Sequence, residues 1–278
     1  MWTAEKRERH DRSGLRYPSD LSDEEWRVVE PLIPPARRGG RHRSVDLRAV
    51  LNGVLYVLET GCQWRHLPKD LPPRSTVHGY LHLWAWEGTL ERIHHDLYQR
   101  VRAQEGREPS PTAAVLDSQS VRAAEKGGLR RTRFGYDAGK KIKGVKYHIL
   151  VDTLGLLLNV AVHRADIQDR DGTALVLDKA TRAQFPFIRV IFADGGYQGE
   201  VAAAKVKEAG DWRLEIVKRS DQAKGFVVLP KRWLVERTLS WLTRCRRLVR
   251  HYEYYLRTSV AFIRIAMIRL MLRRLARK

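Results

Sequence analysis

Three acidic residues have the type and spacing expected of a catalytic centre. Asp117 and Asp194 each follow a short apolar run typical of a buried strand, and Glu236 lies in the first turns of a helix opened by Pro230. In open α/β sheets, active sites lie beyond the carboxyl ends of the strands. The two Asp side chains could therefore face each other across neighbouring strand ends, with Glu236 as the third acid.

The chemistry open to three converging carboxylates is metal-assisted. Carboxylates repel one another unless cations join them, and a set of hard oxygen ligands without Cys or His suits Mg²⁺ or Mn²⁺. Two such ions roughly 4 Å apart can activate a nucleophile on one side of a phosphodiester and stabilise the leaving oxygen on the other. The sequence thus indicates a candidate site for phosphodiester chemistry.

A purely structural role for each acid also stays open, because an Asp at a strand end often serves as a turn or cap residue. Other acids fit that role better, and we interpret them as turn and helix-start residues: Asp152, Asp166, Asp169 and Asp171. Spacing alone does not separate the two interpretations for Asp117, Asp194 and Glu236.

The order of strands and helices expected around these acids predicts a mixed α/β layer fold. Strands are expected at residues 113–116, 145–151, 156–162, 188–193 and 213–217, and helices at 171–183, 199–209 and 230–241. The second and third strands form a hairpin around the turn at residues 152–155.

The N-terminal third predicts helices instead. Ser22 opens the first with a capping box and Pro34 ends it, Ser44 can cap the second, Ser75 or Thr76 starts the third, and a fourth includes Leu90 to Val101. Helix, short break, helix is the pattern of a helix-turn-helix DNA reader, with the third helix as candidate reader. A plain helical bundle fits the pattern equally well.

Domain boundaries follow from the Gly- and Pro-containing stretch at residues 105–111. We expect a flexible extension over residues 1–16, a helical DNA-binding domain over 17–108, and a catalytic domain over 109–278 that includes basic C-terminal helices. No apolar segment near the start fits a signal peptide, and arginines interrupt the apolar C-terminal stretch. We therefore expect no membrane association and a cytoplasmic, nucleoid-associated protein.

Charge points to a polyanionic partner. The chain has 52 Lys and Arg against 32 Asp and Glu, and residues 237–278 hold 11 Arg and one Lys against a single acid. With only two cysteines, a disulfide framework and a Cys-rich zinc module are unexpected. The candidate phosphate contacts lie in the loop before the second strand and around the last helices: Lys140, Lys141, Lys143, Arg232, Arg237, Arg244, Arg246 and Arg247.

Four motifs carry a resemblance to a known family. They are DSQSVR at 117–122, GYDAGKKIKGVKYHILVDTLG at 135–155, ADGGYQG at 193–199 and WLVERT at 233–238. The N-terminal motifs YPSDLS at 17–22 and GCQWRHLP at 61–68 add to them. Together the motifs resemble the DDE transposases of bacterial insertion sequences, and most closely the insertion-sequence-five family, over nearly the whole chain.

This resemblance implies a ribonuclease-H-like catalytic domain whose mixed sheet is flanked by helices and preceded by the helical domain. It implies Asp117, Asp194 and Glu236 as catalytic, Mg²⁺-binding residues, with Mn²⁺ as a possible substitute. It also implies cleavage of double-stranded DNA at element ends, transfer of the 3′-hydroxyls into target DNA, and a homodimer in the synaptic complex. Arg232 fits the family's helix signature, whereas Leu229 and Thr243 stand where that signature has Tyr and Lys.

Two other functions stay open. A nuclease or resolvase of the same fold would cut DNA without joining it. A non-catalytic DNA-binding regulator would need no acidic cluster, because carboxylates facing DNA weaken binding to phosphates.

Overall fold

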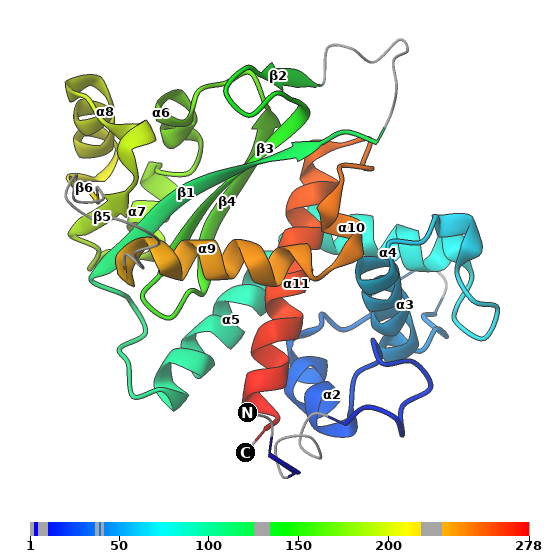
Figure 1. The fold of residues 1–278 in the computed structure, drawn as a ribbon. Coiled ribbons are helices and arrows are strands. Elements are labelled where there is room, and N and C mark those ends of the chain that lie inside the picture. Colours follow the sequence, from blue (N-terminus) through cyan, green and yellow to red (C-terminus); the bar gives the residue numbers. More distant parts are fainter. Residues whose placement is uncertain are drawn as a thin grey trace. The chain divides into compact units, whose positions relative to one another are not determined.

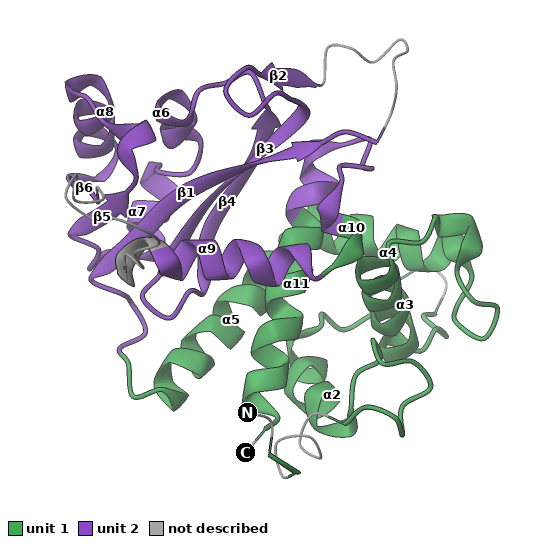
Figure 2. Ribbon diagram, in the orientation of Figure 1, with its two compact units in different colours: residues 1–107, 245–247, 261–278 green, residues 108–244, 248–260 purple. Residues whose placement is uncertain are grey.

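Two compact units make up the chain (Figure 2). Unit 1 comprises residues 1–107, 245–247 and 261–278, and unit 2 comprises residues 108–244 and 248–260. The computed structural model describes residues 3–4, 11–36, 39, 42–124, 134–217 and 230–277, with side chains over the same ranges except at 230–232.

Unit 1 is helical, as the sequence predicts. Its helices are α2 (Asp23–Val29), α3 (Leu47–Thr60), α4 (Arg74–Trp86), α5 (Thr89–Gln104) and the later part of α11 (Leu256–Leu275), with two short 3-10 turns, η1 (Glu30–Leu32) and η2 (Trp64–His66). The capping box of α2 is present, since Ser22 Oγ accepts from Glu25 N and Glu25 accepts from Ser22 N. Helix α3 is capped by Asp46 and not by Ser44, and ends at Gly61 in the left-handed conformation.

The core of unit 1 gathers apolar side chains from several helices. A small apolar cavity marks where they meet, and it is lined by Val29, Ile33, Leu51, Trp84, Leu90, Ile93, Ile265 and Ile268. Arginines of α11 form ion pairs inside the unit: Arg264 with Glu91, and Arg269 with Glu59. Part of the basic C-terminal charge is therefore neutralised within the fold.

The segment before α2 is anchored to unit 1. Arg12 binds both carboxylate oxygens of Glu25 at 2.8 and 2.9 Å, and Arg16 Nε lies 3.3 Å from Asp20 Oδ2. Residues 11–16 of the expected extension are thus tied to the helical unit. Most of the rest of that extension, residues 1–2 and 5–10, lies outside the described residues.

His94 gives unit 1 a pH-dependent stability. Burial, then Arg264 and His95, lowers the pKa of His94 to about 3, and its Nε2 has no hydrogen-bond partner in the described part of the chain. The unfolded chain binds this proton below about pH 6.5, whereas the folded chain does not. The stabilisation is complete above pH 6.5 and is lost progressively as the pH falls toward 3.

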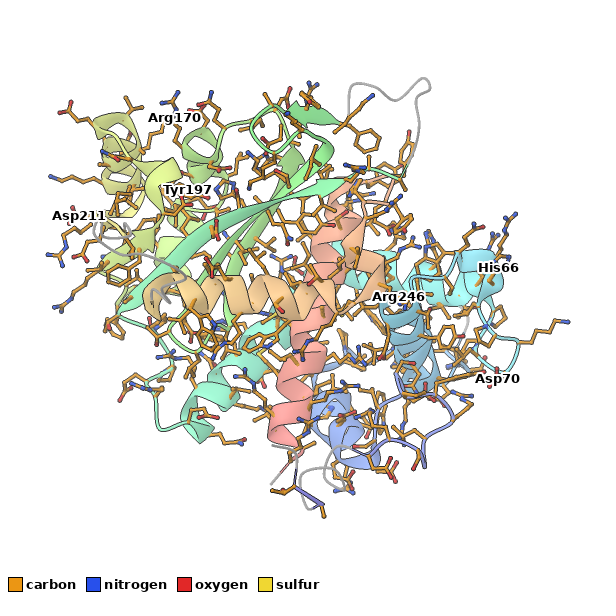
Figure 3. All side chains as sticks on the ribbon, viewed as in Figure 1. His66, Asp70, Arg170, Tyr197, Asp211 and Arg246 are labelled. Carbon is orange, nitrogen blue, oxygen red and sulfur yellow. The ribbon has the colours of Figure 1, made fainter. Side chains whose placement is uncertain are left out.

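We therefore expect the free energy of unfolding to fall by about 2 kcal/mol from pH 7 to pH 5 on account of His94. Urea titrations at the two pH values measure this change. His94→Leu should make the measured fall smaller by about 2 kcal/mol. The matched control is His66→Leu, the same change at an exposed histidine of η2 (labelled in Figure 3). An unchanged pH dependence in His94→Leu would contradict the prediction.

Within the described residues, a six-stranded mixed sheet forms the centre of unit 2. Its strands are β1 (Ala113–Arg122), β2 (Gly135–Asp137), β3 (Ile142–Asp152), β4 (Leu157–Arg164), β5 (Val190–Ala193) and β6 (Arg213–Ile216). The strand order is β2-β3-β1-β5-β6, with β4 paired to β3. β1 is antiparallel to β3 and parallel to β5, and β5 is parallel to β6.

Helices flank this sheet, and Figure 1 shows α9 running alongside it. They are α6 (Asp169–Gly172), α7 (Lys179–Gln184), α8 (Glu200–Gly210) and α9 (Pro230–Thr243), with the 3-10 turns η4 (Thr173–Leu175) and η5 (Gly195–Tyr197). Further along, α10 (Arg246–Val249) and α11 contribute residues to both units. None of the described helices combines the length and hydrophobicity needed to span a bilayer.

Three elements differ from the sequence predictions. The first strand is longer than residues 113–116, because its alternate polar residues continue the pairing with β3. The helix expected over 171–183 is broken into α6, η4 and α7, and Asp178 caps α7 by accepting from Thr181 N. Strand β2 lies within the stretch interpreted as a basic loop.

Candidate active site

Strand register brings Asp117, within β1, beside Asp194, just after β5, at the edge where the parallel β1–β5 pairing ends. The parallel partners of β1 and β5, such as Val115 and Phe192, are always 77 residues apart. Asp117 and Asp194 have the same separation, two residues further along, so they are the next pair on the same face of the sheet. Asp194 keeps an extended backbone, with φ −83° and ψ −179°, and so continues the direction of β5.

Local hydrogen bonds orient both carboxylates. Asp117 Oδ1 accepts from Ser118 N at 2.7 Å, and Asp194 Oδ1 accepts from Gly196 N at 2.9 Å, which makes Asp194 the N-cap of η5. Both side chains are half-buried. Asp194 is thus a cap residue and also shares the location of Asp117, so for Asp194 the two interpretations are compatible.

Glu236 lies on α9, which packs against β1, β3 and β5. The helix is fixed to the β3–β4 turn because Thr238 Oγ1 donates to Gly155 O at 2.7 Å and Arg237 donates to Leu154 O at 2.9 Å. The Glu236 side chain is exposed, next to the buried face formed by Val235 and Thr238. α9 therefore carries an acid beside the strands that carry Asp117 and Asp194.

The donor atoms at this edge are of the type that binds a hard cation. Asp117 and Asp194 supply carboxylate oxygens, which Mg²⁺ prefers. Among the residues that the structure describes, no three His, Cys, Asp or Glu side chains are grouped closely enough to hold a metal ion. Glu236 is accordingly not assembled with the two Asp residues into a three-ligand centre.

Asp152, the other strand-end acid, has a structural role. It is fully buried, and its Oδ1 accepts from Leu154 N and Leu156 N at 2.8 and 2.9 Å. Asp152 thus shapes the turn between β3 and β4, as its sequence context predicts.

Five of the predicted phosphate contacts are exposed cations. They are Lys140 and Lys141 at the β2–β3 turn, Lys143 at the start of β3, and Arg244 and Arg246 after α9, the last labelled in Figure 3. Their exposure is what contact with a DNA backbone requires.

Two other predicted contacts are engaged inside the protein. Arg237 lies between the rings of Trp233 and Trp241, at 4.5 and 4.8 Å from their centroids. Arg247 is buried and donates to Cys62 O at 3.1 Å. Both side chains are therefore held by contacts within the protein. The side chain of Arg232 lies outside the described residues.

A polar cluster beside Asp117 was not singled out by the sequence. Lys146 is buried, and its Nζ lies 2.7 Å from Asp169 Oδ1 and 2.8 Å from Ile167 O. Ser118 Oγ donates to the same Asp169 oxygen at 2.7 Å. Burial works to raise the pKa of Asp169, but the bonds from Lys146 and Ser118 outweigh it, so this pKa lies below its ordinary value. A lysine within a central strand was the available signal, because a buried cation needs a partner.

Comparisons with known proteins match both parts of the chain. The family described as "Transposase DDE domain" matches residues 108–271, and the "Putative transposase of IS4/5 family" matches residues 21–94. No solved structure matches significantly.

Two curated relatives also match part of the chain. The "Insertion element IS402 uncharacterized 16.2 kDa protein" of Burkholderia cepacia is 35% identical over 113 residues, which are 38% of this chain and 76% of the relative. The "Uncharacterized protein y4sN" of Sinorhizobium fredii (strain NBRC 101917 / NGR234) is 27% identical over 116 residues, covering 41% and 86%. With the mixed sheet and its flanking helices, the matches give unit 2 a ribonuclease-H-like fold. The chain belongs to the DDE transposases, in the IS4/5 group.

Proposed function

We propose that this protein binds the ends of an insertion element, hydrolyses phosphodiesters there, and joins the freed 3′-hydroxyls to target DNA. The observation that carries the proposal is the shared register position of Asp117, within β1, and Asp194, directly after β5. Membership of the DDE transposases supports it. Two acids at that edge, on a chain with a formal charge of +20, suit a site that acts on a phosphate polymer.

In this mechanism Asp117 and Asp194 would hold divalent cations, and Glu236, which the described structure does not group with them, would join them from α9. Mg²⁺, or Mn²⁺ in its place, would supply charge for activating a hydroxyl nucleophile and stabilising the leaving oxygen. The protein's own part is positioning: Ser118 N and Gly196 N orient the two Asp carboxylates. The scissile phosphate would bind at the same strand edge, with the exposed cations holding the flanking backbone.

Unit 1 is the candidate reader of the element ends. Helix α4 exposes Arg74, Ser75 and Gly79 along its first turns, the part of a recognition helix that contacts base edges in helix-turn-helix proteins. We propose that α4 enters the major groove and that two copies of the chain act on the two ends of the element as a homodimer.

The test is a strand-transfer assay. A duplex carrying an element end and flanking DNA is incubated with the protein, Mg²⁺ and a target plasmid. Cleavage at the end together with joined product supports the proposal. Cleavage without joining would indicate a nuclease or resolvase, and binding without cleavage a regulator.

The exposed cations make a separate prediction about salt. The logarithm of the DNA-binding constant should fall with the logarithm of the salt concentration, with a slope of about −0.9 per neutralised phosphate. In the double variant Lys141→Ala and Lys143→Ala, the slope should become shallower by about 1.8. Gel shifts over a salt series measure it.

Lys207→Ala is the matched control, because Lys207 is an exposed lysine of the same unit on α8. Its slope should equal that of the native protein. If the double variant keeps the native slope, the β2–β3 turn does not contact phosphates.

A further inference from the structure

Tyr197 is a buried residue of the site edge that the proposed mechanism does not use. It lies three residues after Asp194 at the end of η5, and its side chain has 0% exposure. Figure 3 labels it, and η5 packs against α6. Its hydroxyl lies 2.7 Å from His148 Nε2 on β3.

A hydrogen-bonded chain continues from His148 into the protein. His148 Nδ1 lies 3.1 Å from His163 Nε2, and His163 Nδ1 lies 2.9 Å from Arg164 O. Gly172 is packed against both rings, since a Cβ added there would lie 2.6 Å from His148 and 2.9 Å from His163. The two rings therefore have little freedom to turn.

The direction of every bond in this chain follows from its last member. A carbonyl oxygen only accepts, so His163 Nδ1 donates to Arg164 O. Burial lowers the pKa of both histidines, that of His148 to about 3, so each ring is neutral near pH 7 and carries one N–H. His163 Nε2 then accepts from His148 Nδ1, and His148 Nε2 accepts from Tyr197. The tyrosine hydroxyl thus donates to His148 Nε2.

The backbone between Asp194 and Tyr197 needs such an anchor. Gly195 and Gly196 fill the gap, and glycine restricts its backbone least of all residues. Both are exposed, and a Cβ at Gly195 would meet nothing within 4 Å. Asp194 thus follows β5 on one side, and on the other side Tyr197 is the first buried residue after it.

We propose that Tyr197 is a positioning residue for Asp194, and that it acts through its hydrogen bond to the His148–His163 pair. This inference rests on the proposed role of Asp194 as a ligand of divalent cations. Residues that orient metal ligands typically change metal affinity or activity by about 10–100-fold when they are removed.

The experiment measures Mn²⁺ binding by the full chain without DNA, from the electron paramagnetic resonance signal of free Mn²⁺. Tyr197→Phe should weaken binding by about tenfold or more. Its matched control is Tyr136→Phe, the same change at an exposed tyrosine of β2 in the same unit, which should bind Mn²⁺ as the native protein does. Thermal melting verifies that each variant is folded.

Two substitutions of His148 test the hydrogen bond itself. His148→Gln places an amide oxygen near the Nε2 position and can still accept from Tyr197, whereas His148→Asn keeps a donor near Nδ1 for His163 and loses the contact with Tyr197. His148→Asn should resemble Tyr197→Phe, and His148→Gln should bind Mn²⁺ more tightly than His148→Asn. A purely structural role would make the two His148 variants alike in Mn²⁺ affinity.

The outcomes separate this inference from the proposed function. If Asp194→Asn loses Mn²⁺ binding while Tyr197→Phe keeps the native affinity, only the role of Tyr197 is wrong. If Asp194→Asn binds Mn²⁺ like the native protein, the proposed metal site is wrong and the inference with it. Equal affinities for the two His148 variants would also overturn the inference.

Discussion

Asp194→Asn is expected to lower the rates of DNA cleavage and joining by about a thousandfold or more while leaving DNA binding intact. Losing one group that stabilises developing charge already costs about 10²–10³ in rate, and this ligand would serve both reaction steps. Asn keeps the size of Asp and an oxygen that can accept from Gly196 N, so the η5 turn should persist. Unit 1, the proposed reader of the ends, is unchanged by the substitution.

The measurement pairs gel shifts with strand-transfer assays on one element-end duplex. Asp171→Asn is the matched control, because Asp171 is an exposed acid of α6 whose contact is a 3.4 Å pair with Lys205. Its activity should equal that of the native protein. Native protein with Ca²⁺ in place of Mg²⁺ should bind DNA and cleave it poorly, since Ca²⁺ accepts looser geometries. Near-normal joining by Asp194→Asn would contradict the prediction and would mean that Asp194 serves only as a turn residue.

Much of the positioning of the site was predictable from the sequence. The apolar run before Asp117 and the one before Asp194 mark strands, and the parallel register follows once the two strands are neighbours. Local sequence patterns also predict the capping box at Ser22 and the turn at Asp152, because both involve contacts between residues only a few positions apart.

What the sequence did not reveal depends on contacts between distant residues. Lys146 pairs with Asp169, and Tyr197 with His148, across separations of 23 and 49 residues. No periodicity marks such pairs. Asp169 in particular has the local signature of a helix start, which is also its backbone role, and only the fold shows the buried lysine beside it.

Arginine was similarly ambiguous in sequence. Arg264 and Arg269 contribute to a basic run that suggests phosphate contacts, yet both are partners of glutamates inside unit 1. The run also holds Arg244 and Arg246, whose side chains are exposed. The sequence gives the number of charged residues in a segment. Only the packing shows which of them stabilise the fold and which face solvent.

Gly144→Ala is expected to have the largest effect on stability. Gly144 of β3 is paired with Arg122 of β1 and with Gly135 of β2. A Cβ at this position would overlap Val121 O and lie 2.8 Å from Ala123 N, so it would meet rigid backbone of the strand that carries Asp117. Because a backbone cannot move aside as a side chain can, the β1–β3 pairing must shift.

We expect Gly144→Ala to lower the free energy of unfolding by about 3 kcal/mol, the upper range for forced overpacking. Urea unfolding followed by circular dichroism measures it. The matched control is Gly79→Ala, since Gly79 lies within α4 with nothing within 4 Å of an added Cβ. That change should stabilise the protein by up to about 1 kcal/mol, because Ala favours helix more than Gly does. If Gly144→Ala unfolds like the native protein, β1 and β3 are not packed as closely at Gly144 as the structure has them.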